Sequence, residues 1–361
     1  MSIDFQVSPS AHPRSQAERD AILANPGFGT HFTDHMVAID WTQADGWHNA
    51  QGRAYGPLSL SPASAVLHYA QEVFEGLKAF RHADGSIWSF RPEANGARMQ
   101  HSARRLALPE LPVETFVESI RQLVSIDKDW VPSGGEASLY LRPFMIANED
   151  FLGVRAAQRA AYYVIASPAG AYFKGGVKPV SIWLSRDYSR AGKGGTGSAK
   201  CGGNYASSLL PQQQAMANGC AQVLFLDSQE GRYIEELGGM NVFMVQRDGS
   251  VITPELSGSI LEGITRLSVI QLLRDRGVSV TERRIDVQEW IDGMRSGDIV
   301  ETFACGTAAS ISPIGVLKGT DFSVGNADAE PGELTMSIRK ELTDIQYGRS
   351  EDRHGWLTKL A

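Results

Sequence analysis

The chain's length, composition and charge exclude several classes of protein. At 361 residues it exceeds the usual size of a single hydrophobic core, which predicts two domains. The formal net charge of -7 is spread without acidic or basic blocks, so a nucleic acid is not an expected partner. The three cysteines, Cys201, Cys220 and Cys305, form neither a CxxC pair nor a metal-binding spacing with the histidines, so no metal ion is expected. No apolar run is long enough to cross a bilayer, and the first residues lack a signal-peptide core, which predicts a cytoplasmic protein with no membrane partner.

The first half of the chain has the pattern of a mixed α/β domain. Residues 1–27 are polar and contain three prolines, so an irregular N-terminal arm is expected there. Residues 28–170 are expected to form the smaller, N-terminal α/β domain. Pro92 suits the first turn of a helix, and apolar residues at three-and-four spacing after Val113 predict a second helix. The expected strands are residues 36–41, 86–90, 138–147 and 161–166, and the expected helices are 92–106 and 113–124.

A glycine- and proline-rich stretch between Ser167 and Pro179 interrupts the hydrophobic pattern and predicts an interdomain linker at residues 171–180. A larger C-terminal α/β domain is expected over residues 181–361. Because strands and helices occur in both halves, the fold class is predicted to be α/β, of the mixed α+β kind. The expected strands are 180–184, 222–227, 232–235, 241–246, 251–252, 278–283, 299–304 and 310–317, and the expected helices are 205–218 with a bend at Pro211, 264–273 and 331–347.

Lys200 stands in a segment of mostly small residues with five glycines, GGTGSAKCGGNY at residues 194–205. A Walker phosphate loop requires serine or threonine after its lysine, and Cys201 stands there instead. A dinucleotide fingerprint requires a third glycine at the position that Lys200 occupies. The segment therefore holds either a solvated surface lysine or an amine that forms a Schiff base with a carbonyl and then moves a proton.

Other polar residues accompany Lys200 or follow apolar strands. Tyr205 begins a predicted helix, where its ring either caps the helix or brings its hydroxyl to the same ligand as Lys200. Glu235 and Glu236 end a predicted strand before Leu-Gly-Gly-Met-Asn. A carboxylate at such a position is either exposed or faces a heteroaromatic nitrogen.

Two small-residue segments predict anion sites. Residues 262–265 open a helix, and free backbone N–H groups with the Thr265 hydroxyl suit a phosphate. Residues 304–309 form a turn after a strand, with amides that can approach an anion closely. Arg98, on a predicted helix, is either a solvated charge or a further phosphate ligand. Together with the amine of Lys200, these features describe a site for pyridoxal 5′-phosphate, a cofactor that acts as an electron sink.

The sequence resembles the branched-chain-amino-acid aminotransferases, which are fold type IV pyridoxal-phosphate enzymes. The resemblance covers nearly the whole chain, from FGTHFTDHM at 28–36 to IQYG at 345–348. It implies two α/β domains with the active site at the domain interface. The blocks between these ends that carry it are LHYAQEVFEGLKAF at 67–80, SFRP at 89–92, DKDWVP at 127–132, SLYLRP at 138–143, KCGGNY at 200–205 and GGMN at 238–241.

By this resemblance the chain is a transaminase that moves the amino group of L-leucine, L-isoleucine or L-valine to 2-oxoglutarate in a ping-pong cycle. Lys200 would hold pyridoxal 5′-phosphate as a Schiff base and move the proton. Tyr205 would bind the phenolic oxygen of the cofactor, and Glu236 would pair with its ring nitrogen. The phosphate ligands that the resemblance implies are Arg98, Ile264, Thr265 and Thr307.

The same resemblance implies a substrate pocket and a homodimer. Aromatic side chains would form an apolar pocket, Tyr69 and the turn at Ala308 would hold the α-carboxylate, and Arg142 would receive the distal carboxylate of glutamate. Leu152 and Val154 would reach across the dimer into the partner's pocket. The implied substrate-binding residues are Phe28, Tyr69, Phe74, Tyr140, Arg142, Thr307 and Ala308.

Two positions depart from the pattern of the family. Ala309 and Ser312 stand where some members carry a redox-sensitive CxxC pair, which excludes thiol switching by that pair. Gly239 stands where some members carry a threonine near the substrate carboxylate, so binding there relies on other donors. The alternatives within the fold are a D-amino-acid aminotransferase and an aminodeoxychorismate lyase. From a different class, a non-catalytic nucleotide- or phosphate-binding module is the alternative, although both of its motifs are missing.

Overall fold

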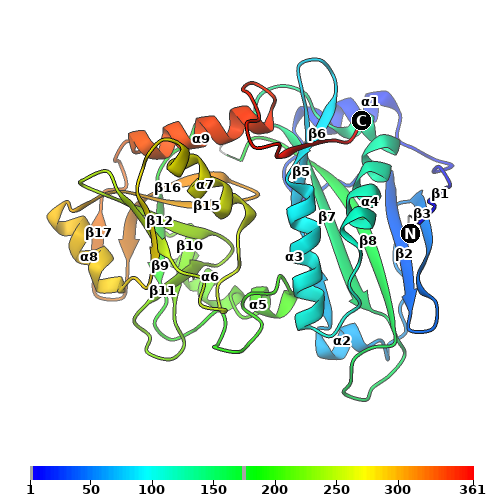
Figure 1. Cartoon of the computed structure of the whole chain (residues 1–361), viewed down its shortest axis with the longest axis horizontal. Helices are drawn as coiled ribbons and strands as arrows, with labels where there is room; N and C mark the ends of the chain where they lie inside the picture. The colour runs from blue at the N-terminus through cyan, green and yellow to red at the C-terminus, as the bar shows by residue number, and fades with distance from the viewer. Residues whose placement is uncertain (1–2, 173–175) are drawn as a thin grey trace. The chain divides into compact units, whose positions relative to one another are not determined.

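The computed structural model describes residues 3–172 and 176–361, and these form two compact units (Figure 1). Unit 1 contains the described residues up to 172 together with 199–202 and 345–361, and unit 2 contains the described residues of 173–198 and 203–344. Residues 173–175, part of the expected linker, lie outside the described residues, and the expected domain boundaries stay a prediction. Lys200 belongs to unit 1, although the segments before and after it belong to unit 2.

Within the described residues, unit 1 is built on a nine-stranded sheet (Figure 1). Its strands are β1 (Gln6–Val7), β2 (His35–Thr42), β3 (Gly46–Ala54), β4 (Glu72–Phe74), β5 (Leu77–Arg81), β6 (Ile87–Phe90), β7 (Ser138–Ala147), β8 (Arg159–Ala169) and β18 (Leu357–Lys359). They pair in the order β1-β3-β2-β8-β7-β5-β6-β18, and β4 pairs with β7 off this path. The pairs along this sheet are antiparallel except for β1 with β3.

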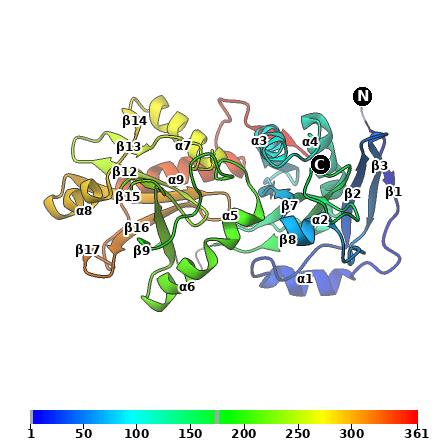
Figure 2. The ribbon, with the colours of Figure 1, turned by 90° about the horizontal axis from the view of Figure 1, so that it is seen from below.

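Helices α3 (Pro92–Arg105) and α4 (Val113–Ile126) lie side by side against the sheet of unit 1 (Figure 2). The apolar spacing predicted from the sequence brings Phe116, Ile120 and Leu123 to the inner face of α4, where each is fully buried. Two further helices, α1 (Gln16–Ala24) and α2 (Ala65–Tyr69), complete the described helices of this unit apart from a short 3₁₀ turn.

The expected irregular arm over residues 1–27 is wrong, because α1 and β1 lie within it. The hydroxyl of Ser15 accepts the backbone N–H of Glu18, and the Glu18 carboxylate accepts the N–H of Ser15. This capping box satisfies backbone donors that the first turn of a helix leaves without partners. The three prolines of the segment therefore lie outside these two short elements and do not prevent them from forming.

Within the described residues, unit 2 is built on a second nine-stranded sheet. Its strands are β9 (Val180–Leu184), β10 (Gln222–Leu226), β11 (Ile234–Leu237), β12 (Asn241–Gln246), β13 (Val251–Pro254), β14 (Val280–Arg283), β15 (Ile299–Gly306), β16 (Ser310–Lys318) and β17 (Ser323–Gly325). They pair in the order β11-β10-β9-β16-β15-β12-β13-β14, and β17 pairs with β16 off this path. The sheet is mixed, because β9 is parallel to both of its neighbours and β13 is parallel to β14.

The helices of unit 2 follow or cover this sheet (Figure 1). They are α5 (Gly202–Ala206), α6 (Leu209–Ala217), α7 (Ile264–Asp275), α8 (Val287–Ser296) and most of α9 (Glu333–Gln346). Trp290 of α8 is fully buried in the core that the helix forms with the sheet. No helix among the described residues is long and apolar enough to span a membrane.

Two expected elements of unit 2 are wrong in their bounds. The expected helix at 205–218 is two helices, α5 and α6, which are separated at Ser207 and Ser208. Pro211 lies in the first turn of α6, where the missing N–H costs no intrahelical hydrogen bond, so it bends nothing. The strand expected at 232–235 lies two residues later as β11, so its two glutamates stand inside the strand.

Candidate active site

The main chain around Lys200 is tied to unit 1 on both sides. The backbone N–H of Lys200 donates to the hydroxyl of Ser102 at 2.9 Å, and its carbonyl accepts the N–H of Phe74 at 3.0 Å. The side-chain amine lies 4.8 Å from the centre of the Phe74 ring. The lysine is therefore no solvated loop residue: its amine lies against an aromatic face in a segment whose backbone is fixed.

Unit 1 brings together four of the expected substrate residues, one of which, Phe74, lies against this amine. The rings of Phe28 and Tyr140 meet edge to face at 5.1 Å. The guanidinium of Arg142 lies 4.8 Å from the Phe74 ring and donates a 3.1 Å hydrogen bond to the Tyr140 hydroxyl. Gly76 is required there, because an added Cβ would collide with that hydroxyl. The result is an apolar cluster with one cation beside the lysine.

Tyr69 ends α2, and its hydroxyl donates to the carbonyl of Leu152. The Tyr69 side chain is 41 % exposed, and the side chains of Leu152 and Val154 are 60 % and 86 % exposed. Apolar side chains this exposed favour contact with another surface. The structure thus places Tyr69 beside the loop that carries the two residues expected to reach a partner subunit.

Arg98, an expected phosphate ligand, is half-buried and paired. Its Nε and Nη2 donate to the two carboxylate oxygens of Glu75, each at 2.8 Å. Glu75 is fully buried and also accepts a 2.7 Å hydrogen bond from Asn95. This forked pair fixes the orientation of the guanidinium. The sequence interpretation missed Glu75, although a single charge inside the apolar run from Val73 to Leu77 was a signal for a buried partner.

In unit 2, Glu236 is held as a buried carboxylate. Its Oε1 accepts the backbone N–H of Leu261 at 2.8 Å and pairs with Arg190 Nη2 at 2.6 Å. Arg190 also donates to the carbonyls of Gly197 and Ser259, which joins two loops to the carboxylate. The sequence interpretation missed Arg190, because nothing near it in the sequence indicates a partner on β11.

Glu235 is buried as well, so the alternative that this pair ends a strand in solvent is wrong. Glu235 is 4 % exposed and Glu236 is 3 % exposed. Because successive side chains of a strand alternate between its faces, the two carboxylates point to opposite sides of β11. Burial raises the pKa of Glu235, and the hydroxyl of Ser259 and the charge of Arg190 lower it in part.

The start of α7 has the properties expected of an anion site. Its N-cap is Gly263, which makes no side-chain cap, so the first backbone N–H groups have no capping acceptor. Ile264 and Thr265 form the buried first turn. Gly263 lies so close to Asn241 that an added Cβ would collide with the amide oxygen of that side chain. The helix start is therefore fixed against β12.

The turn between β15 and β16 holds Thr307 and Ala308, two further expected ligands. An added Cβ at Gly306, just before them, would lie 3.1 Å from the side chain of Met240, so this turn lies against residues 239 and 240. At Gly239 the nearest atom to an added Cβ would be a ring carbon of Tyr205 at 3.9 Å. There is thus room at Gly239 for a Cβ atom. Unit 2 brings together Tyr205, Gly239 and the two turns.

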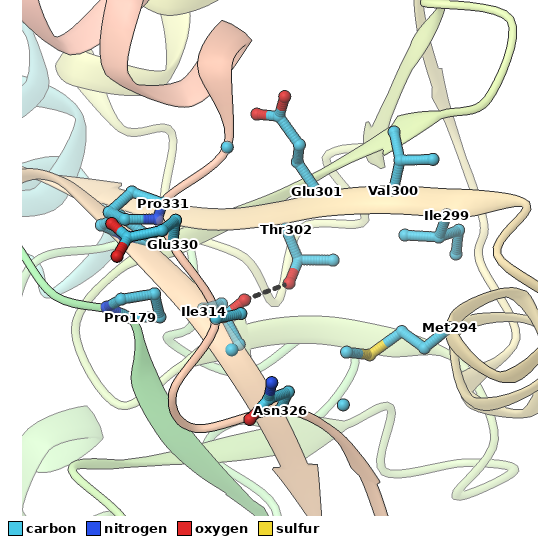
Figure 3. Close-up of a pocket in the computed structure, with 15 residues that line it drawn as sticks. Pro179, Met294, Ile299, Val300, Glu301, Thr302, Ile314, Asn326, Glu330 and Pro331 are labelled. Atoms are coloured by element: carbon cyan, nitrogen blue, oxygen red, sulfur yellow. Dashed lines mark hydrogen bonds between the residues drawn. The ribbon is translucent and has the colours of Figure 1, made fainter.

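A pocket elsewhere in unit 2 lies between β15, β16 and the segment before α9 (Figure 3). Its volume is about 220 Å³. The hydroxyl of Thr302 donates to the carbonyl of Ile314 at 2.9 Å, and the carboxylate of Glu301 accepts the N–H groups of Leu334 and Thr335. These polar groups stabilise the sheet and cap α9, and the expected site residues do not line the pocket.

The chain belongs to the class IV aminotransferase family. The sequence profile described as "Amino-transferase class IV" matches residues 72–316, which is more than half of the chain. Membership of this family sets aside the interpretation as a non-catalytic nucleotide- or phosphate-binding module. It also confirms the resemblance on which the expected roles of the site residues rest.

The similar proteins are branched-chain-amino-acid aminotransferases. One from Mycolicibacterium smegmatis is 59 % identical, and the alignment covers 99 % of this chain and 98 % of the relative. One from Mycobacterium tuberculosis is 56 % identical over 99 % of both chains.

Solved structures of branched-chain amino acid aminotransferases have the same fold. The enzyme from Escherichia coli matches with a TM-score of 0.73 at 26 % identity, covering 90 % of this chain and 99 % of that one. A second such enzyme, solved in complex with N-(5′-phosphopyridoxyl)-L-glutamate, matches with a TM-score of 0.73 at 28 % identity, again covering 90 % of this chain and 99 % of that one. The expected mixed α/β fold of type IV is thereby confirmed.

Proposed function

We propose that the protein transfers the amino group of L-leucine, L-isoleucine or L-valine to 2-oxoglutarate, giving the branched 2-oxo acid and L-glutamate. The observation that carries the proposal is the cluster of unit 1, where the amine of Lys200 and the guanidinium of Arg142 both lie over the ring of Phe74. A reactive amine beside apolar rings suits an apolar amino acid, and the cation beside it suits an acidic one. The names of the similar proteins support the same activity.

The donor set of the chain fits pyridoxal 5′-phosphate as the cofactor. Lys200 supplies an amine that can bond to its aldehyde, and Glu236 supplies a buried acceptor for a protonated ring nitrogen. The uncapped first turn of α7 suits its phosphate. When bound, the cofactor supplies an electron sink for the negative charge that develops on the α-carbon of the substrate. The residues proposed to hold it are Lys200, Tyr205, Glu236 and, at the phosphate, Arg98, Ile264, Thr265 and Thr307.

Lys200 is proposed to act twice in each half of the reaction. Its amine first holds the cofactor covalently and is released when the substrate amine takes its place. The freed amine would then remove the proton from the α-carbon of the amino acid and move it to the C4′ position of the cofactor. Because hydrogen bonds hold the backbone at Lys200, only the side chain has to move. The cycle is proposed to be ping-pong, with the 2-oxo acid leaving before 2-oxoglutarate binds.

Glu236 and Tyr205 are proposed to orient and polarise the ring. An ion pair with the Arg190 guanidinium and a hydrogen bond from the Leu261 N–H hold one oxygen of the Glu236 carboxylate, so the group stays at a fixed place. The hydroxyl of Tyr205 is proposed to donate to the phenolic oxygen. These contacts keep the ring in one orientation while the amine of Lys200 moves.

The substrate is proposed to bind by its two ends. Tyr69, Thr307 and the turn at Ala308 would hold the α-carboxylate, and the side chain would lie among the aromatic rings of Phe28, Phe74 and Tyr140. The edge-to-face contact of Phe28 with Tyr140 keeps these rings packed. Arg142 would receive the distal carboxylate of glutamate. The solved complex with N-(5′-phosphopyridoxyl)-L-glutamate supports an acidic substrate for a protein of this fold.

A homodimer is proposed in which Leu152 and Val154 reach the partner's pocket. Their high exposure in the single chain supports this arrangement. We also propose that the enzyme works in the cytoplasm. The three cysteines are buried and unpaired, which suits a reducing compartment.

Substitution of Lys200 by alanine tests the proposed function. The wild-type protein, purified with pyridoxal 5′-phosphate, should absorb in the visible region, and L-leucine should bleach this band. Borohydride should attach the cofactor to a peptide that contains Lys200. The Lys200→Ala protein should lose both the band and the turnover, whereas Lys193→Ala, at an exposed lysine of the same loop, should keep them.

Ordinary turnover by Lys200→Ala would overturn the assignment. Faster bleaching by D-alanine than by L-leucine would favour a D-amino-acid aminotransferase instead. Release of an aromatic acid from aminodeoxychorismate would favour the lyase.

A further inference from the structure

Strand β4 presents two side chains to the segment that carries Lys200. Val73 points into the core of unit 1 and is fully buried, so its neighbours Glu72 and Phe74 face the opposite way. Phe74 contacts Lys200 both through its backbone N–H, at 3.0 Å from the carbonyl, and through its ring, at 4.8 Å from the amine. Glu72 is thus on the same face of β4 as the ring that lies against the lysine.

The carboxylate of Glu72 holds the far end of this segment. Its Oε1 accepts the backbone N–H of Gly202, two residues after Lys200. With the bonds of the Lys200 N–H to Ser102 and of the Phe74 N–H to the Lys200 carbonyl, three hydrogen bonds restrain residues 200–202. Glu72 makes the one that follows the lysine, and it is charge-assisted, which makes it the strongest kind.

Half-burial of the Glu72 carboxylate removes water from a charged group, which costs free energy. Burial raises the pKa of Glu72, while the N–H of Gly202 and the charge of Arg142 lower it. Buried polar groups persist where a partner offsets their desolvation. The Gly202 N–H is such a partner. Its hydrogen bond to Glu72 therefore explains how a carboxylate can be half-buried at this position.

The two glycines after Cys201 differ in their surroundings. A Cβ added to Gly202 would collide with Oε1 of Glu72, whereas a Cβ added to Gly203 would meet nothing within 4 Å. The close approach of the carboxylate is therefore possible only because residue 202 has no side chain. Gly203 provides a matched control for Gly202.

We propose that Glu72 is a positioning residue for the reaction, which fixes the main chain of residues 200–202 so that the amine of Lys200 stays over Phe74. The inference rests on the proposed role of Lys200 and deepens it. Glu72 acts on the amine through the backbone of Gly202 and touches neither substrate nor cofactor.

Hydrogen exchange in the full-length holoenzyme tests the contact itself. In Glu72→Ala the peptide that covers residues 199–203 should exchange about tenfold faster than in the wild type, because the Gly202 amide loses its acceptor. In Glu72→Gln, whose side-chain oxygen still accepts, the change should be less than about threefold. The exposed Glu114→Gln should leave this peptide unchanged.

Steady-state kinetics test the consequence for the reaction. Glu72→Ala should lower kcat about tenfold and change the KM for L-leucine by less than about twofold, and Glu72→Gln should restore most of kcat. Gly202→Ala should lower kcat in the same way and Gly203→Ala should not. In the double variant Glu72→Ala/Gly202→Ala, the second substitution should cost little, because the colliding oxygen is gone.

Unchanged exchange at residues 199–203 in Glu72→Ala would overturn the proposal. Exchange that rises equally across unit 1 would also overturn it, because Glu72 would then be a general stabiliser. Failure of the proposed function is a separate result. Borohydride would then attach no cofactor at Lys200 in the wild type, whatever the exchange of the Glu72 variants.

Discussion

Replacing Arg190 by methionine tests how unit 2 holds the carboxylate of Glu236. The substitution removes the cation 2.6 Å from Oε1, while the Leu261 N–H still donates to a carboxylate that is 3 % exposed. Removing one partner of a buried pair typically costs about 3–5 kcal/mol, because the other charge stays desolvated. Loss of the two bonds to the carbonyls of Gly197 and Ser259 adds about 1 kcal/mol each. Arg190→Met should therefore destabilise unit 2 by about 5–7 kcal/mol.

A second substitution separates the charge from the carbonyl bonds. Glu236→Gln keeps an oxygen for the Leu261 N–H but carries no charge. In Arg190→Met/Glu236→Gln only the carbonyl bonds are lost, so the double variant should be about 3–5 kcal/mol more stable than Arg190→Met alone. If glutamine at residue 236 recovers stability that Arg190→Met lost, the loss came from a Glu236 carboxylate left buried without its cation.

Urea-dependent hydrogen exchange in peptides from β11 measures this stability within unit 2 of the cofactor-free protein. Peptides from β7 in unit 1 provide the internal control. Effects of the two substitutions that add to within about 0.5 kcal/mol would refute the reasoning, because they would mean that Arg190 and Glu236 act independently.

Two further substitutions test the stability linked to Glu235 and the substrate binding proposed for Arg142. Burial raises the pKa of Glu235 above its ordinary value of 4.5, so the stability linked to its proton is fully present below pH 4.5 and is lost as the pH rises through the folded-state pKa. Glu235→Gln should consequently be about 1 kcal/mol more stable than the wild type at pH 7 and no more stable at about pH 4, as thermal unfolding at the two pH values would reveal. Arg142→Met should raise the KM for 2-oxoglutarate about 30-fold and that for L-leucine by less than about threefold, because only the former loses a charge-assisted hydrogen bond. Equal rises in both KM values would remove Arg142 from the distal-carboxylate role.

Much of the fold was predictable, because the periodic elements carry their pattern in a short stretch of sequence. The strand expected at 138–147 has the bounds of β7, and the helix expected from Val113 is α4. The elements that were missed depend on distant partners or on local caps. β1 is two residues long and exists only because β3 pairs with it, and α1 depends on the Ser15 capping box.

The site residues also fall into two groups: those that a local sequence pattern marks and those that depend on distant partners. Lys200 could be singled out because an isolated amine among glycines is unusual, although its role stays a prediction, and the start of α7 was predictable because helix starts are local. Arg190 and Glu75 were not, because their roles depend on carboxylate or guanidinium partners brought to them by the fold. A buried charge has no sequence pattern of its own: it becomes visible only when its partner is known.

The glycines around Lys200 have separate physical causes. A Cβ at Gly197 would collide with the backbone of Ser259, and a Cβ at Gly202 would collide with the carboxylate of β4, so both are required by the chain's own close contacts. Gly203 has open space around it, so no close contact of the chain requires a glycine there. Glycine content alone therefore does not distinguish room for a ligand from tight chain-to-chain approach. The segment of small residues allows the backbone of Lys200 to be fixed against β4. In the proposed reaction, such a fixed backbone would let the lysine side chain leave and return to the same place.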